Sequence, residues 1–359
     1  MYRRMYSDEF FSKMQKIALD RWRDVEKLSN EKLLQENGLL FYGEDTGETV
    51  EGSVLGVKNT MEKLNLSHTF YSSGDEIFKA YPSLGGCKGK DYSGVSEDTA
   101  GHIRASAACK AMIKAAGDSC TVQTKTKIVS IDIDAKDRLG KRISAVTEDG
   151  KIILANNVII AAGPWTNKML EMAGLPSLDL KVWQVQWAHY LVEDSNLAES
   201  IPQAFHFRKE NGIDGGLYYV FPSSATESIH TNDKDKKTYV KVGVDFITGK
   251  EMDDMNSFDY KGSEEVLKLM DGWVKEHLPQ AGKRIDSYCS PYTMTTDSDF
   301  VMDTVADDVA LFAGGNGRAF KFGPLLGDCM VSLLTDEDPP VALERFSAKR
   351  DAIRLKTFQ

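Results

Sequence analysis

The chain has 359 residues, a formal net charge of -10, and 42% hydrophobic and 27% charged residues. These values are typical of a globular protein, and the length allows one large or two moderate domains. The negative charge argues against a nucleic-acid surface, because phosphate binding needs a basic footprint. No apolar run approaches the roughly 20 residues that cross a bilayer. We therefore expect neither nucleic acid nor a membrane among the partners.

The cysteines and the two ends of the chain carry no sorting or metal-binding pattern. The cysteines are scattered: Cys87, Cys109, Cys120, Cys289 and Cys329. They form neither an even disulfide framework nor a paired metal motif. The Met-Tyr-Arg-Arg start lacks an apolar signal-peptide core, and the C-terminal Lys-Thr-Phe-Gln lacks a peroxisomal Ser-Lys-Leu signal. The sequence thus predicts an intracellular, cytoplasmic protein without a metal site, and it leaves the oligomeric state open.

Helical spacing of apolar residues marks the first part of the chain. Ser7 can cap a helix whose apolar side chains recur on one face as far as about Leu28. A second helix is expected from about Ile103 to Ala116, where Gly117 ends it. His102 is read as an ordinary helix residue, because no carboxylate or cysteine pattern accompanies it.

Alternation of apolar and polar residues predicts strands in the middle of the chain. Residues 121–162 read as a β-meander with a hairpin turn at Asp149 and Gly150. Residues 182–246 read as further strands, in which the charged loop 232–237 is a solvated hairpin tip. A helix is expected from Ser263 to His277.

One of these strands, residues 239–245, carries charged groups at alternate positions. Period-two alternation places Lys241, Gly243 and Asp245 on one face, while Val240, Val242 and Val244 lie on the other. From the residues alone, the face with the lysine can be either a solvent side or part of a site, and a solvent side is the more ordinary interpretation.

Two buried strands end in small residues. Residues 157–165 run through Ala162 and Gly163 to Trp165, and residues 309–327 run through glycines into a helix with Pro324 at its first turn. Backbone amides freed at such a turn can face an anion or a polar ring edge. The alternative is a close-packed junction of strand and helix, because glycine also serves packing.

Together the two stretches resemble the late flavin-contacting segments of the FAD-dependent amino-acid oxidase family, in its sarcosine, pipecolate, saccharopine and fructosyl-amino-acid oxidase branch. The run from Gly314 to Phe322 resembles the branch's Gly-x-x-Gly-His-Gly-Phe-Lys pattern, with Arg318 and Ala319 where His-Gly usually stands. The similarity covers nearly the whole chain from Arg3 onward. It implies an α/β fold in which an FAD/NAD(P)-binding-type domain (1–36, 91–180 and 297–359) interleaves with an antiparallel-sheet substrate domain (37–90 and 181–296).

The resemblance also implies an activity: oxidation of the C–N bond of a secondary-amine amino acid, with FAD as cofactor, oxygen as acceptor, and imine and hydrogen peroxide as products. Lys241 matches the lysine that promotes reaction of the flavin with oxygen, and Tyr219 matches an active-site tyrosine. Asp245 stands where sarcosine oxidases have a histidine and some fructosyl-amino-acid oxidases an acidic residue. This favours a substrate larger than sarcosine, with a cationic or hydroxyl-rich part.

Further residues are assigned by the same resemblance. Arg3 and Lys321 match the arginine and lysine that bind the substrate carboxylate. For Arg3 the alternative is a surface residue near a frayed terminus. The residues expected to contact the cofactor are Ala162, Gly163, Trp165, Cys289, Ser290, Gly315, Asn316, Gly317, Arg318, Phe320 and Lys321.

Cys289 and Ser290 lie where relatives attach the flavin to a cysteine thioether. Alignment on Tyr292 and Thr293 puts Ser290 at that position and Cys289 one place early. A shift of one residue turns a strand side chain to the other face. Covalent attachment and a buried free thiol both remain open.

The Gly-x-Gly-x-x-Gly turn that holds a dinucleotide pyrophosphate does not occur in the chain. The nearest approach, Gly315-Asn-Gly-Arg-Ala-Phe320, lacks the third glycine. By resemblance, Met1 falls after that unit, so we expect an N-terminally truncated member of the family. The alternative function is therefore a shortened, non-catalytic paralogue that does not bind FAD.

Overall fold

The computed structural model describes residues 1–44, 52–135, 140, 143–210, 213–222, 238–245, 251–335 and 337–353. The chain forms two compact units. Unit 1 comprises residues 1–111, 184–249 and 259–290, and unit 2 comprises residues 112–183, 250–258 and 291–359. Residues 1–36, which we expected in the cofactor domain, belong to unit 1. The functional division into cofactor and substrate domains remains a prediction.

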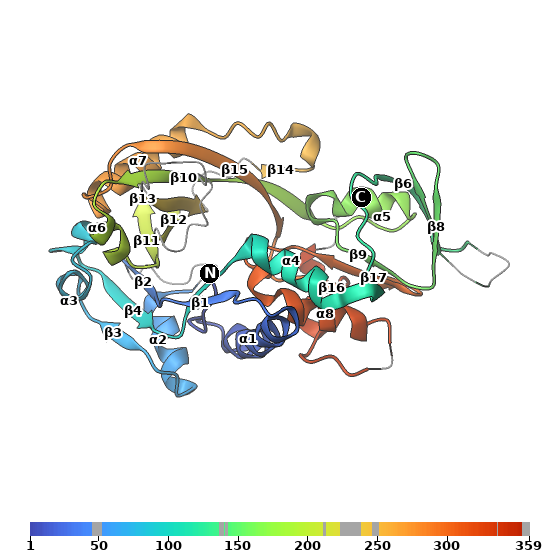
Figure 1. Cartoon of the computed structure of the whole chain (residues 1–359), viewed down its shortest axis with the longest axis horizontal. Coiled ribbons are helices and arrows are strands. Elements are labelled where there is room, and N and C mark those ends of the chain that lie inside the picture. Colours follow the sequence, from blue (N-terminus) through green and yellow to red (C-terminus); the bar gives the residue numbers. More distant parts are fainter. Residues whose placement is uncertain are drawn as a thin grey trace. The chain divides into compact units, whose positions relative to one another are not determined.

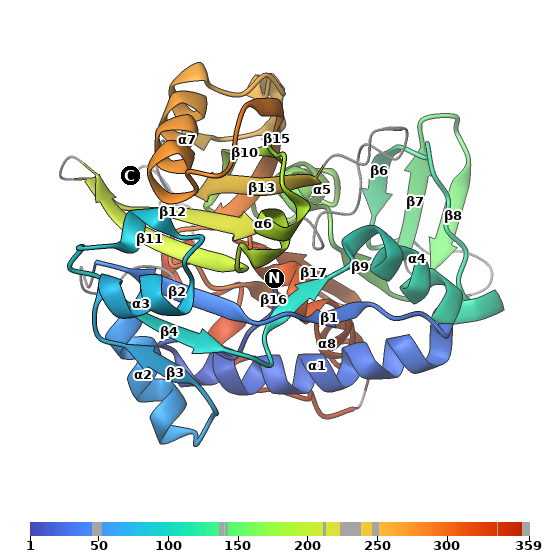
Figure 2. The same ribbon diagram turned by 60° about the vertical axis from the view of Figure 1, so that its left-hand side comes forward.

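Helices are interspersed among runs of strands along the described chain (Figures 1 and 2). The helices are α1 (Glu9–Ser29), α2 (Val54–Lys63), α3 (Gly74–Ala80), α4 (Ala105–Ala116), α5 (Thr166–Met172), α6 (Ser195–Ser200), α7 (Glu264–His277) and α8 (Gly323–Ser332). The first strands are β1 (Leu34–Glu36), β2 (Leu39–Gly43), β3 (Thr69–Tyr71), β4 (Ser93–Glu97), β5 (Gly101–Ile103), β6 (Ile128–Asp132), β7 (Ile143–Thr147), β8 (Ile152–Ala155) and β9 (Val158–Ile160). The later strands are β10 (Leu180–Val192), β11 (Ala204–Glu210), β12 (Ile213–Phe221), β13 (Thr238–Asp245), β14 (Glu251–Met252), β15 (Arg284–Thr295), β16 (Val301–Ala306) and β17 (Val309–Ala313). No described helix is long and apolar enough to span a bilayer.

Unit 1 is organised around one sheet, in which neighbouring strands follow the order β10-β13-β12-β11-β2-β4-β3. Its pairs are antiparallel except for β11 with β2. Helix α7 covers one face (Figure 2) and buries Met270 and Trp273 against Val240, Val242 and Val244 of β13. Burial of this apolar surface is the main stabilising contribution on that face.

On the opposite face of the same sheet, the described residues of unit 1 form a second apolar cluster. The β2 and β4 end of this face packs Phe41 and Val95 against Val57 and Met61 of α2. Toward β12, β13 and β10 the face carries polar and aromatic side chains instead, beginning at Lys241. The sheet therefore has one face buried against α7 and another face that carries the polar and aromatic side chains of the candidate site.

Unit 2 contains two smaller sheets. In the first, β9 lies parallel to β17, and β17 pairs antiparallel with β16. The second is the antiparallel meander β6-β7-β8. Because β9 and β17 are parallel neighbours, their carboxyl ends open at the same edge of the sheet, and each continues into a turn and a helix.

The predicted elements are confirmed in most places. Helix α1 has Asp8, and not Ser7, as its N-cap, because the Asp8 carboxylate accepts the Phe10 amide at 2.8 Å. The prediction for His102 is wrong: it lies on β5, which pairs with β1, and α4 begins only at Ala105. Residues 232–237, the expected hairpin tip, lie outside the described residues.

Candidate active site

The face of β13 that carries Lys241, Gly243 and Asp245 forms the centre of the candidate site in unit 1. The predicted alternation is confirmed, since the three valines of β13 lie in the core under α7. Across the sheet, Lys241 pairs with Phe221 of β12 and Gly243 pairs with Tyr219. Cross-strand neighbours lie on the same face of a sheet. The sheet thus brings Lys241, Tyr219 and Asp245 together.

The ammonium of Lys241 is held by aromatic rings. Its Nζ lies 4.1 Å from the centroid of Trp187 and 5.4 Å from that of Phe221. Among the residues that the structure describes, none forms a hydrogen bond or an ion pair with this nitrogen. Burial lowers the pKa of Lys241 to about 8, although the charge of Asp245 opposes the shift. A cation poised near neutral pH, with its N–H groups available, is a feature of functional sites.

Gly243 makes room for Tyr219. A Cβ at position 243 would lie 2.0 Å from Cζ and 2.2 Å from the hydroxyl oxygen of Tyr219. The tyrosine is buried, and its ring meets Phe221 edge-on at 6.1 Å between centroids. Glycine at this position therefore lets Tyr219 lie flat across β13, beside Lys241.

Trp187 of β10 is a site residue that the sequence analysis missed. It pairs with Gly243 in register, stacks on Tyr288 of β15 with centroids 4.4 Å apart, and meets His189 edge-on at 5.3 Å. His189 Nδ1 lies 2.8 Å from Oδ1 of Asp286, which also accepts the His189 amide. Two aromatic neighbours, Tyr288 and His189, therefore hold the indole over which Lys241 lies.

Arg3 is a buried residue at the edge of the same unit. Its guanidinium carbon lies 4.4 Å from the centroid of Tyr6 and 4.6 Å from that of Phe205, and its Nε donates to the Met5 carbonyl at 2.9 Å. Phe205 pairs with Tyr219 in the sheet. The alternative of an exposed, frayed residue is therefore wrong.

Glu97 explains why the segment around Arg3 is fixed. This buried carboxylate accepts the Arg4 amide at 2.8 Å, the Met5 amide at 3.2 Å and the Thr99 hydroxyl at 3.0 Å. Burial raises the pKa of Glu97, while these hydrogen bonds lower it in part. A single side chain thus satisfies two backbone amides next to Arg3.

In unit 2, β9 ends in an open turn. Gly163 has φ of +53° with no atom near the position of a Cβ, and it begins a 3-10 turn, Gly163–Trp165, that leads into α5. Trp165 is 48% exposed, and Ala162 caps the turn through its backbone. The turn thus presents a backbone with little side-chain bulk.

The turn after β17 is built from positive-φ residues, Gly314, Asn316 and Gly317. The Asn316 side chain folds inward: its Oδ1 accepts the Thr295 amide at 2.8 Å and its Nδ2 donates to the Gly314 carbonyl at 2.7 Å. Gly317 is required because a Cβ there would lie 2.3 Å from the ring of Tyr292. The side chain of Asn316 therefore shapes the turn, and its backbone amide is also engaged, since it donates to the Thr293 carbonyl at 3.0 Å.

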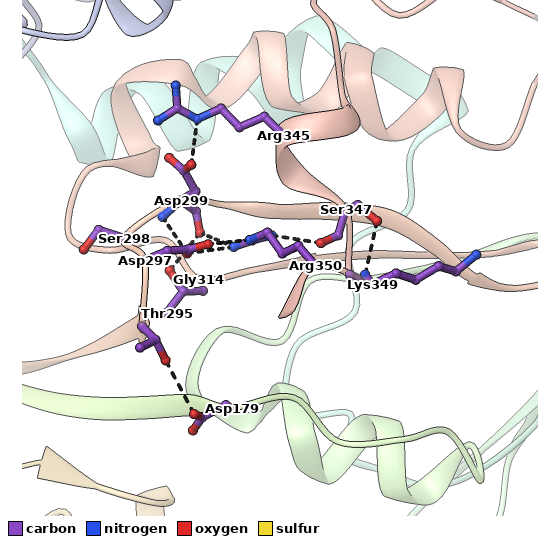
Figure 3. A network of polar contacts seen from close by, with 12 residues as sticks. Asp179, Thr295, Asp297, Ser298, Asp299, Gly314, Arg345, Ser347, Lys349 and Arg350 are labelled. Atoms are coloured by element: carbon purple, nitrogen blue, oxygen red, sulfur yellow. Dashed lines mark hydrogen bonds and ion pairs between the residues drawn. The ribbon is translucent and has the colours of Figure 1, made fainter. Parts of the chain in front are cut away.

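Arg318 also turns into the fold. It is buried, donates to the Ser298 carbonyl and lies 4.0 Å from Oδ1 of Asp299. Asp299 in turn accepts Nε of Arg345 at 2.6 Å, within the polar network shown in Figure 3. The Arg318 side chain therefore anchors the glycine turn to the loop after β15.

Two further residues follow in the 3-10 turn Ala319–Phe322. Lys321 is buried, and its Nζ lies 5.9 Å from the centroid of Phe322. Phe320 is 43% exposed. A buried lysine beside a turn of glycines is a chemically suitable receptor for a carboxylate.

Cys289 and Ser290 both lie on β15. Cys289 carries a free thiol, as in the alternative interpretation, but this thiol is half-buried instead of buried. Attachment of a flavin to either residue remains a prediction.

These residues fit an FAD molecule in chemical type. Unit 1 offers a half-buried lysine whose ammonium contacts only rings among the described residues, which suits an electron-rich ring system or an anion. Unit 2 offers two turns at the carboxyl ends of adjacent parallel strands, where Gly163 leaves its backbone open. In open α/β sheets ligands bind at this edge.

Comparisons with known proteins agree with this chemistry. Residues 2–333 match the family described as FAD dependent oxidoreductase. The chain is 24% identical to mouse peroxisomal sarcosine oxidase, over 97% of this chain and 84% of that protein. It is also 24% identical to the monomeric sarcosine oxidase of Bacillus sp. strain NS-129, over 95% and 82% of the two chains.

A solved structure of NikD, an unusual amino acid oxidase essential for nikkomycin biosynthesis, superposes with a TM-score of 0.80 at 22% identity. The match covers 96% of this chain and 85% of NikD, which supports the predicted α/β fold. Because the family match spans most of the sequence, the chain belongs to the FAD-dependent oxidoreductases.

Proposed function

We propose that the protein is an oxidase of a secondary-amine amino acid that uses oxygen as electron acceptor. The substrate's α C–H and N–H bonds are lost, a C=N bond forms, and two electrons and two protons reduce oxygen to hydrogen peroxide. Bound FAD would supply the redox step by taking up the electron pair and passing it to oxygen. The residues of the chain orient the substrate and provide charge.

The observation that carries this proposal is the environment of Lys241. Its half-buried ammonium contacts Trp187 and Phe221, and its N–H groups have no protein acceptor among the described residues. Reduction of oxygen places negative charge on the oxygen molecule. A fixed cation in a site of low dielectric constant stabilises that charge strongly. This supports a role of Lys241 in the oxygen reaction.

Each unit holds one cation that is proposed as a receptor for a substrate carboxylate. Arg3 is held between Tyr6 and Phe205 in unit 1, and Lys321 is buried in unit 2. Charge-assisted hydrogen bonds to a carboxylate are among the strong ones in proteins. Tyr219, which lies flat over Gly243, is proposed to contact the substrate's amine.

The proposed substrate class is supported by Asp245. A carboxylate on the site face of β13, two residues from Lys241, favours a substrate with a cationic or hydroxyl-rich part. Saccharopine and fructosyl-amino-acid types fit this better than pipecolate or sarcosine, which carry no cationic or hydroxyl group besides the reacting amine. In the cofactor part, the turns at Ala162 and at Gly315 are proposed to contact FAD through their backbones.

The test is an assay of hydrogen peroxide with the protein reconstituted with FAD. We expect peroxide with at least one of saccharopine, a fructosyl amino acid, pipecolate or sarcosine. Lys241→Met should retain substrate oxidation with an artificial electron acceptor and lose most of the oxygen reaction. Bound FAD without turnover of any secondary amine would contradict the proposed substrate class. Failure to bind FAD at all would favour the alternative of a non-catalytic paralogue.

A further inference from the structure

The aromatic cluster around Lys241 extends beyond the residues that the proposed function uses. We propose that Trp187 is a positioning residue for Lys241: its indole holds the lysine ammonium on the site face of β13, and Tyr288 and His189 hold the indole. This inference rests on the proposed function only for its kinetic consequence. The contact itself can be tested without cofactor or substrate.

The geometry of the contact is that of a cation over a ring. Nζ of Lys241 lies 4.1 Å from the Trp187 centroid, well within the roughly 6 Å at which such pairs attract. Phe221, at 5.4 Å, is a weaker second ring. Tryptophan has the most strongly attracting face of the aromatic side chains. Trp187 is therefore the dominant partner of this ammonium among the described residues.

The indole is itself constrained, which a positioning role requires. Tyr288 stacks on it with an interplanar angle of 23°, and His189 meets it edge-on at 79°. Asp286 accepts the His189 amide at 3.3 Å and lies 2.8 Å from its Nδ1. Lysine has a flexible four-carbon stem and several rotamers. A ring fixed from two sides restricts where that stem can place its charge.

Within the described part of the chain, no acceptor competes with the rings for this ammonium. Among the described residues, none accepts a hydrogen bond from Lys241 Nζ. An aromatic face attracts the charge without consuming an N–H donor. Trp187 can thus hold the ammonium and leave the N–H donors of Lys241 available to the reacting oxygen. A carboxylate in the place of Trp187 would neutralise the charge of the ammonium. We infer that this is why an aromatic ring faces the lysine.

The first experiment measures the contact in the flavin-free protein by tryptophan fluorescence. An ammonium close to an indole shifts its emission, so Lys241→Met should change the emission spectrum of the protein. The same substitution in a Trp187→Phe background should change it hardly at all. An equal spectral change in both backgrounds would overturn the proposed contact, because the affected tryptophan would then be another one.

The second experiment measures the kinetic consequence in the FAD-loaded protein by stopped-flow absorbance. Trp187→Leu should slow the reaction of the reduced protein with oxygen by about tenfold, as expected for loss of a desolvated cation–π contact. Anaerobic reduction by substrate should change much less. Trp187→Phe keeps a ring face and should restore most of the rate. In a Lys241→Met background, Trp187→Leu should have no further effect.

The outcomes separate the two proposals. If Lys241→Met reacts with oxygen normally, the proposed role of Lys241 fails, while the fluorescence cycle still decides the contact. If Lys241→Met is slow and Trp187→Leu is as fast as the unaltered protein, Trp187 does not position the charge. Equal slowing by Trp187→Leu with and without Lys241 would also overturn the inference, because it would indicate a general structural effect.

Discussion

The candidate residues of the two units differ in kind. In unit 1 the site is made of side chains: Lys241 and Tyr219 project from one face of a sheet whose other face is closed by α7. In unit 2 the side chains of Asn316 and Arg318 turn inward, so the candidate residues of the glycine turn offer little side-chain bulk of their own. Substitutions in unit 1 should therefore change reaction rates, whereas those in unit 2 should change cofactor binding and stability.

The largest effect is expected at Gly317 in unit 2. Gly317→Ala forces a left-handed residue and a clash with Tyr292, which together cost about 2 to 5 kcal/mol. We expect a lower unfolding temperature and weak binding of FAD, measured by thermal unfolding and flavin titration. Gly174→Ala is the matched control, since Gly174 has φ of +68° and open space around it. If both variants bind FAD equally well, the close approach to Tyr292 has no role.

In unit 1, Lys241→Met should leave the cofactor content unchanged and slow the oxygen reaction. Loss of one electrostatic contact to developing charge costs about 3 kcal/mol, or roughly a hundredfold in rate. Stopped-flow absorbance follows this step apart from substrate oxidation. Lys181→Met, which removes an exposed lysine paired with Asp253, is the control. Equal slowing of both half-reactions would make Lys241 a structural residue.

Much of this difference between the units is visible in the sequence, and part of it is not. The period-two pattern of residues 239–245 predicts the two faces of β13 correctly, because side-chain alternation is a local property of a strand. The same holds for the strand, turn and helix around Gly314. Local patterns therefore predict where the residues of the candidate site lie along the chain.

Contacts between distant segments are not predictable in this way. Trp187 meets Lys241 only because β10 pairs with β13 in one register, and nothing in either segment specifies that register. Likewise the need for Gly243 comes from Tyr219 of a neighbouring strand, and the inward turn of Arg318 depends on Asp299. His102 was misassigned for the same reason, since pairing with β1 draws residues 101–103 into a strand.

The ionisation of Lys241 gives a smaller, graded test of the unit 1 site. Because burial lowers its pKa to about 8, the charged form should be lost as the pH rises through that value. One pH unit above this pKa, the rate of the oxygen reaction should therefore be roughly tenfold lower than its low-pH plateau. Asp245, His189 and Tyr219 also face this region. Lys241→Arg stays charged and should remove the step; a step that persists would belong to another group.

The smallest effect is expected at Asp297 in unit 2, which binds Arg350 in the network of Figure 3 through contacts of 2.6 and 3.0 Å. Burial alone would raise the pKa of this carboxyl, but the bonds from Arg350 and from the Asp299 amide lower it. A lowered pKa means that the ion pair stabilises the fold at pH values above about 3.9, the ordinary pKa of an aspartate carboxyl. That stabilisation is lost as the pH falls through the pKa of Asp297 in the folded protein. Asp297→Asn should therefore cost about 1 kcal/mol at neutral pH and progressively less in acid, measured by urea unfolding.

Two comparisons make this last prediction specific. Asp253→Asn breaks an ion pair in which the aspartate side chain is 90% exposed, so it should have no measurable effect. The oxygen reaction of the Asp297 variant should equal that of the unaltered protein, because the ion pair holds residues 344–353 to the loop after β15 and no reacting group. A pH-independent loss of stability would show that packing, and not the charge, is what Asp297 contributes. A slower oxygen reaction with unchanged stability would contradict the proposed difference between the units, in which side chains of unit 1 set the reaction rate and unit 2 contributes stability and cofactor binding.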